Sequence, residues 1–215
     1  MRRVLLAAGA AALGVAAPAQ AADVAVLLEA KSARESPSLD APVVQRVPAR
    51  RPITRTPTSL PVVSDARDGA NREWLEVRLP GRPNGATGWI VKRRTVIDVV
   101  PWRIAVDLSA RTVSVYKGRR RVRRMRAVIG APTTPTPVTS SFVEEIVRYR
   151  AGAKLGPYAL ALAARSTVFS EFDGGPGQVA IHGRGRLGGT PRSPACRPAG
   201  RGRGWPPGPG RRRTR

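Results

Sequence analysis

The sequence predicts an all-β protein made of short strands and turns. Prolines occur every few residues between positions 37 and 61, which forbids long helices because proline lacks the amide proton that a helix needs. Farther along, apolar and polar residues alternate at period two, as in strands that bury one face. No segment repeats at a fixed period, so a solenoid is excluded.

The composition excludes several classes of site. The chain has 215 residues, with 38 Lys plus Arg against 14 Asp plus Glu, for a formal charge of +24. Most of the basic residues are arginine, and the chain is rich in glycine and proline, so part of the charge is consistent with a GC-rich coding sequence. One cysteine and one histidine exclude a disulfide framework, a zinc finger and any multi-histidine metal site.

Residues 1–21 have the parts of a secretory signal peptide. Arg2 and Arg3 precede an apolar run at 4–17, and residues 18–21 read P-A-Q-A, so we expect cleavage after Ala21. The alternative is a membrane anchor, but the run is shorter than the roughly 20 apolar residues that span a bilayer. We therefore expect a secreted mature chain with no integral membrane segment. Export also argues against a nucleic-acid partner, despite the charge.

Residues 23–98 are expected to form a small β domain. Its clearest part is a period-two strand at 74–79, a turn at 80–85 and a second strand at 88–91. The pattern W-x-x-V, a loop and then G-W-I resembles the end of bacterial SH3-like domains, which implies an SH3-like barrel. The alternative is any β-hairpin with two buried tryptophans.

A linker at 99–102 is expected to lead into a second β-rich region. Residues 103–108 and 112–116 alternate as a hairpin, and the basic stretch 119–126 predicts a third strand whose apolar residues do not keep period two. We favour a solvated edge strand protected by arginine over a polyanion-binding role for that stretch.

Three later segments complete the predicted elements. Residues 127–131 are apolar and predict the end of a strand, before a Thr/Pro loop. Residues 140–149 are compatible with a strand or one short helix. Residues 178–182 form an apolar strand that ends in a histidine beside a glycine.

The inventory of reactive groups favours cysteine chemistry. A serine hydrolase elbow is absent, and the grouped acids, Glu144 with Glu145 and Glu171 with Asp173, carry no further signature. Cys196 and His182 are the remaining pair, and an imidazole within hydrogen-bond reach makes a thiol nucleophilic. On spacing alone, a surface cysteine and a loop histidine would be the better explanation.

Four ordered motifs resemble the YkuD-type L,D-transpeptidases. The segment I-H-G at 181–183, a glycine-rich loop and then S-P-A-C-R at 193–197 resemble the family's active-site motif. The hairpin at 103–116, the V-I-G to P-T-P-x-x-x-x-F segment at 128–142 and L-G-P-Y at 155–158 resemble its earlier motifs in the same order.

This resemblance implies a catalytic β-sandwich at 103–196 that acts on peptidoglycan stem peptides in the cell wall or periplasm. Cys196 would be the nucleophile and His182 the general acid/base, with no metal or organic cofactor. The other implied site residues are Ala195, Gly183 and Ser193 around the oxyanion, and Arg197 near the substrate.

The end of the chain departs from the family pattern. Pro194 and Ala195 stand where the family has His-Gly, and the loop before Cys196 is about two residues shorter than usual. Residues 197–215 are almost entirely Arg, Gly and Pro, so we expect a disordered basic tail and a sandwich that is incomplete at its C-terminus.

Two interpretations of this tail stay open. It is either a wall-binding tail or, as we favour, out-of-frame translation that begins near residues 192–196. The alternative function is a catalytically impaired pseudoenzyme that binds peptidoglycan or anionic wall polymers.

Overall fold

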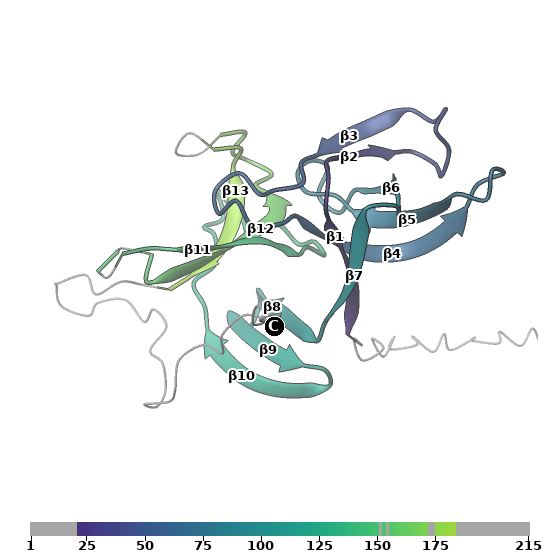
Figure 1. Ribbon diagram of the computed structural model, residues 1–215. Helices are drawn as coiled ribbons and strands as arrows, with labels where there is room; N and C mark the ends of the chain where they lie inside the picture. The colour runs from purple at the N-terminus through teal and green to yellow at the C-terminus, as the bar shows by residue number, and fades with distance from the viewer. Residues whose placement is uncertain (1–20, 151, 154, 172–174, 184–215) are drawn as a thin grey trace, which may run out of the picture.

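The computed structural model describes residues 21–150, 152–153, 155–171 and 175–183 (Figure 1). Within these ranges the chain forms thirteen strands and no helix, which confirms the predicted all-β class. The strands belong to one seven-stranded and two three-stranded sheets. No helix among the described residues is long and apolar enough to cross a membrane.

The N-terminal sheet is antiparallel, with the strand order β3-β2-β6-β5-β4-β1-β7. Its strands are β1 (Ala22–Leu27), β2 (Lys31–Arg34), β3 (Val43–Val47), β4 (Ser59–Arg67), β5 (Glu73–Arg78), β6 (Thr87–Val91) and β7 (Thr95–Val100). The predicted hairpin is confirmed as β5–β6, in which Trp74 faces Val91. Trp74 is fully buried and Trp89 is half-buried. The SH3-like assignment of this region stays a prediction.

The main core lies in this N-terminal sheet. Its buried members come from six strands and the turn after β5: Ala25, Leu27, Ala33, Val47, Leu60, Leu75, Val77, Leu79 and Ile90. Gly88 allows close packing there, since an added Cβ would lie 2.9 Å from Leu79 Cδ1 and 3.1 Å from Ala33 Cβ. Phe142, which follows in the chain more than 50 residues later, packs against the same core.

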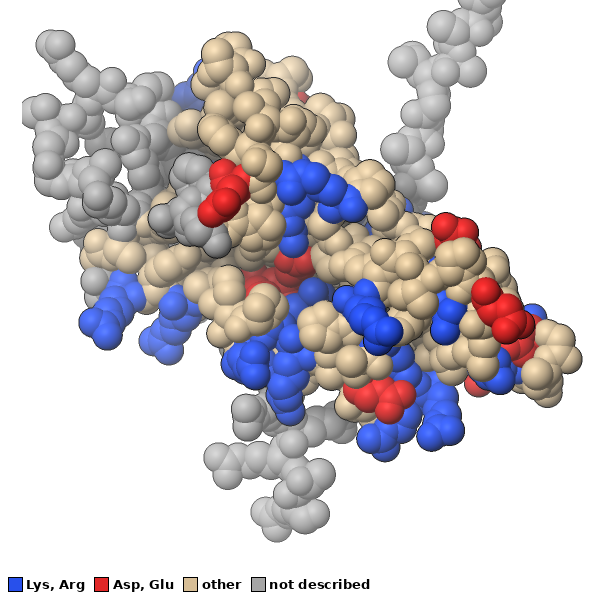
Figure 2. Space-filling view, turned by 90° about the horizontal axis from the view of Figure 1, so that it is seen from above, with Lys and Arg blue, Asp and Glu red and all other residues tan. Residues whose placement is uncertain are grey.

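The second sheet has the order β10-β9-β8. Its strands are β8 (Trp102–Asp107), β9 (Thr112–Lys117) and β10 (Arg120–Arg126), so the predicted hairpin and basic third strand are confirmed. The register of β10 shifts between Arg121 and Arg123, and this bulge explains why its apolar residues do not keep period two. β10 is an edge strand with mostly exposed residues. Figure 2 shows Lys and Arg side chains spread widely over the face seen from above.

The third sheet has the order β11-β12-β13. Its strands are β11 (Val143–Arg148), β12 (Tyr158–Arg165) and β13 (Gln178–His182), and both pairings are antiparallel. The segment at 140–149 is therefore a strand rather than a helix. In Figure 1 this sheet lies beside the N-terminal sheet, and β8–β10 lie below both.

Two sequence-based boundaries differ from the structure. The strand end predicted at 127–131 is wrong, because these residues form a loop in which Gly130 N donates to Thr136 Oγ1 at 2.9 Å and Val128 is 74% exposed. The predicted linker at 99–102 is largely strand, with only Pro101 between β7 and β8. β7 continues to Val100 because β1 offers it a pairing partner as far as Ala22.

Candidate active site

His182 is the last residue of β13, as the sequence predicts. It lies opposite Ala159 of β12, and its side chain is exposed. The ring Nδ1 lies 2.7 Å from the carbonyl oxygen of Gly183. A carbonyl oxygen only accepts, so Nδ1 is the donor and the neutral ring carries its lone pair on Nε2. Nε2 is therefore the nitrogen whose lone pair can act as a base.

A constrained turn leads into β13. Gly177 has φ +61°, a value that glycine tolerates best, and an added Cβ would overlap the carbonyl oxygen of Phe169. Ser166 N donates to Gly177 O at 2.8 Å and closes the loop between β12 and β13. Only glycine fits this position without movement of the backbone.

The end of β13 lies beside a second sequence motif. A Cβ built on Gly183 would lie 3.7 Å from Leu155 O and 3.8 Å from Gly156 Cα. The segment I-H-G and the segment L-G-P-Y, separated by more than 20 residues, are thus adjacent in the fold. The sequence gives the order of the two motifs, and only the structure shows that they are neighbours.

A buried charged cluster lies at the opposite end of β13. The Glu144 carboxylate accepts from Arg165 Nη2 at 3.4 Å and from Gln178 Nε2, and it lies 3.8 Å from Arg51 Nη1. Arg51 is 4% exposed. Burial lowers the pKa of the Arg51 guanidinium, and the neighbouring Glu144 carboxylate opposes that shift.

Glu145, the next residue, has its own partners in the same loop. Its carboxylate accepts from Thr54 N at 2.7 Å and Thr54 Oγ1 at 2.8 Å. Both acids that the sequence left unassigned therefore hold the loop around residues 51–54 against the third sheet. Two adjacent acids give no sequence signal for such contacts, because the partners lie about 90 residues earlier in the chain.

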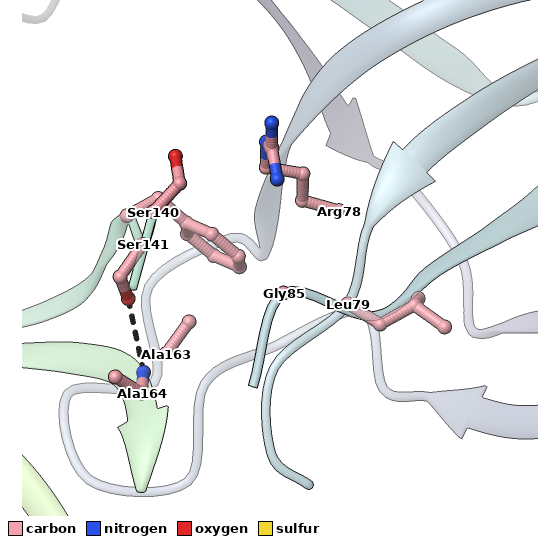
Figure 3. Close-up of a pocket in the computed structure, with 8 residues that line it drawn as sticks. Arg78, Leu79, Gly85, Ser140, Ser141, Ala163 and Ala164 are labelled. Carbon is pink, nitrogen blue, oxygen red and sulfur yellow. Dashed lines mark hydrogen bonds between the residues drawn. The ribbon is translucent and has the colours of Figure 1, made fainter. Parts of the chain in front are cut away.

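A small cavity between the N-terminal and third sheets is too small for a substrate (Figure 3). Its lining residues are Arg78, Leu79, Gly85, Ser140, Ser141, Phe142, Ala163 and Ala164. Its volume is about 10 Å³, roughly the space of one water molecule. Ser141 Oγ accepts from Ala164 N at 3.0 Å, so this serine has a structural contact. The described residues contain no group of three or more His, Cys, Asp or Glu that could hold a metal ion.

Comparison with protein families gives one match. Residues 101–203 match the YkuD family, described as the L,D-transpeptidase catalytic domain. This match indicates an L,D-transpeptidase-type catalytic domain that covers β8–β13, includes His182 and continues past Cys196. Searches of curated proteins and of solved structures returned no match.

Within the region that matches the family, the structure describes the chain only as far as Gly183. The structure places His182 and Gly183 at the end of β13. The other predicted site residues, Ser193, Ala195, Cys196 and Arg197, lie outside the described residues, as does the basic tail. The roles of all six stay predictions.

Proposed function

We propose that the protein is an exported L,D-transpeptidase that cross-links peptidoglycan stem peptides through a cysteine thioester. The family match over residues 101–203 carries this proposal. It is supported by the exposed His182 at the end of β13, whose Nε2 is available as a base. The signal-peptide pattern at 1–21 agrees with a substrate outside the cytoplasm.

The reaction begins with Cys196 and His182. His182 Nε2 takes the thiol proton, and Cys196 Sγ attacks the carbonyl carbon of a peptide bond in a tetrapeptide stem. The C–N bond breaks, and the leaving amine takes the proton from Nε2. An amine of a neighbouring stem then attacks the thioester and breaks the C–S bond, and its proton returns to the thiolate through His182.

Backbone N–H groups near Cys196 stabilise the oxyanion in both steps. Ala195, Ser193 and Gly183 are the residues that we assign to this support, and we assign Arg197 to substrate binding. Pro194 has no N–H to give, and loss of one oxyanion donor costs on the order of a hundredfold in rate. We therefore expect a slow enzyme.

The test is an intact-mass measurement on the mature chain. Incubation with a tetrapeptide stem or a carbapenem should add one acyl group to the native protein and none to Cys196→Ala. His182→Ala should slow the acylation by about 10² to 10⁴. Because the His182 side chain is exposed, this variant should keep its fold.

The control variant is Gln45→Ala, which removes a contact to Pro80 O inside the N-terminal domain and should acylate at the native rate. No mass change in the native protein, beside a labelled active transpeptidase, would contradict activity of this chain. Reading all three frames at the 3′ end of the gene would then show whether another frame carries S-H-G-C.

The second candidate is a pseudoenzyme that binds the wall. The replacement of His-Gly by Pro194 and Ala195 favours it, since this change removes a donor and a flexible residue beside the nucleophile. It predicts wall binding without acylation.

A further inference from the structure

We propose that the N-terminal domain positions the candidate base: Glu144 and Asn84 join it to the third sheet and hold β13, and with it His182, in register. The domain would then be part of the catalytic unit and not only an appended wall-binding module. The role of His182 in this inference rests on the proposed function, but the contacts and their test do not.

The first contact is the buried cluster around Glu144. Its side chain is 8% exposed, and it joins Arg51 of the N-terminal domain to Arg165 at the end of β12. Gln178, the first residue of β13, donates to the same carboxylate and also to Leu162 O at 2.9 Å. One carboxylate on β11 therefore links the N-terminal domain to the start of β13, two strands away.

The second contact is made by the turn between β5 and β6. Asn84 Oδ1 accepts from Arg165 N at 2.7 Å, and Asn84 Nδ2 donates to Arg165 O at 2.9 Å. Asn84 thus pairs with the main chain of β12 as a neighbouring strand would. Gly81 N donates to Ala163 O at 3.0 Å and extends this pairing.

Arg82, in the same turn, binds the loop that leads into β13. Its Nη2 donates to Ser166 O at 2.9 Å and to Phe169 O at 2.6 Å, and its Nη1 donates to Pro176 O at 3.2 Å. Three carbonyls of one loop are therefore held by one guanidinium of the other domain. The length of the turn at 80–85 is explained by this docking.

These contacts matter because register decides where His182 points. β13 pairs with β12 at four positions, and it is the outer strand of its sheet among the described residues. Successive side chains of a strand point to opposite faces, so a slip of one residue would turn His182 to the other face. The contact of Gln178 with Glu144 opposes such a slip from the start of the strand, where Gln178 pairs with Arg165 after an irregularity in the ladder.

The experiment is hydrogen exchange on the full mature chain with two variants. Asn84→Asp keeps the oxygen that accepts from Arg165 N but loses the donor to Arg165 O. Glu144→Gln removes the charge between two arginines. Each variant should speed amide exchange in β13 about tenfold, since a buried polar group loses its partner, while exchange in β5 stays within about twofold.

The second readout is the ring signal of His182, which is the single histidine of the chain and therefore needs no assignment. Both variants should shift this NMR signal, and Gln45→Ala, which removes a contact inside the N-terminal domain, should leave the signal and the β13 exchange unchanged.

Equal acceleration in β5 and β13 would overturn the proposal, because it would show a general loss of stability. An unshifted His182 signal would also overturn it. If Glu144→Gln does not fold, Asn84→Asp tests the proposal alone, since Asn84 is only half-buried. Neither readout requires acylation. The inference therefore holds or fails independently of whether Cys196 is active.

Discussion

At the scale of single residues, Asp68 organises the turn between β4 and β5. Its carboxylate accepts from Trp74 Nε1 at 3.0 Å, from the main-chain N–H of Ala70 and Arg72, and from Arg72 Nη1 at 2.9 Å. The hydrogen bond from Trp74 is the main reason that the pKa of Asp68 lies below its usual range, and the bond from Arg72 N adds to it. The ionised carboxylate is therefore the stronger acceptor for the buried Trp74.

This arrangement predicts stability that depends on pH. A carboxylate whose pKa is lower in the folded state stabilises the fold above its unfolded pKa of about 3.9, and this contribution is lost as the pH falls through the lower folded value. Asp68→Asn should therefore lower the urea midpoint at pH 7, and its gap from the native chain should narrow as the pH falls below about 4.

Urea unfolding at several pH values measures this gap, with the exposed Asp40→Asn as the control, which should show none. A gap that persists unchanged at pH 2 would contradict the assignment of Asp68.

At the scale of elements, the loop before β13 depends on one glycine. Gly177 combines a positive φ with a close approach to Phe169 O, whereas Gly152 has φ +82° in open space. The two positions therefore separate the cost of a positive φ from the cost of a steric overlap. The turn at Gly177 matters for the proposed function because it leads into β13, which ends at His182.

Gly177→Ala should reduce the free energy of unfolding by about 2–3 kcal/mol, since strain and overlap add. The matched Gly152→Ala should cost about 1–2 kcal/mol, the strain alone. Chemical denaturation measures both values. Equal losses in the two variants would show that the overlap at Gly177 relaxes freely, against our description of this turn.

At the scale of the whole molecule, the chain carries a large excess of positive charge. The formal charge is +24, and β10 presents Arg120, Arg121 and Arg124 on exposed positions at the edge of its sheet. A surface of this sign attracts anionic polymers over about a Debye length, which is about 10 Å at 0.1 M salt. The same arginines protect the edge from pairing with other chains.

Sedimentation with purified sacculi tests the attraction. Cys196→Ala should pellet with them at 20 mM salt, and most of it should be released by about 0.5 M salt. Replacing Arg120, Arg121 and Arg124 by Gln should weaken binding at low salt. Binding that resists salt and the triple replacement would instead indicate uncharged recognition of peptidoglycan.

Local patterns predict much of the fold. The β5–β6 and β8–β9 hairpins follow from period-two alternation with turn residues between, since both strands of each pair are close in the chain. The same signal predicts that β13 ends at His182. It fails at 127–131, where the apolar residues form a loop and Gly130 bonds forward to Thr136.

The sequence by itself determined the all-β class and the local hairpins, and it predicts His182 with Cys196 as the pair of reactive residues. Only the tertiary structure decided what Glu144 and Asn84 do. Their partners lie about 80 to 90 residues away, and no local period encodes a contact between two sheets. Strands follow from neighbouring residues, whereas buried polar contacts exist only once the folded chain has brought both sides out of water.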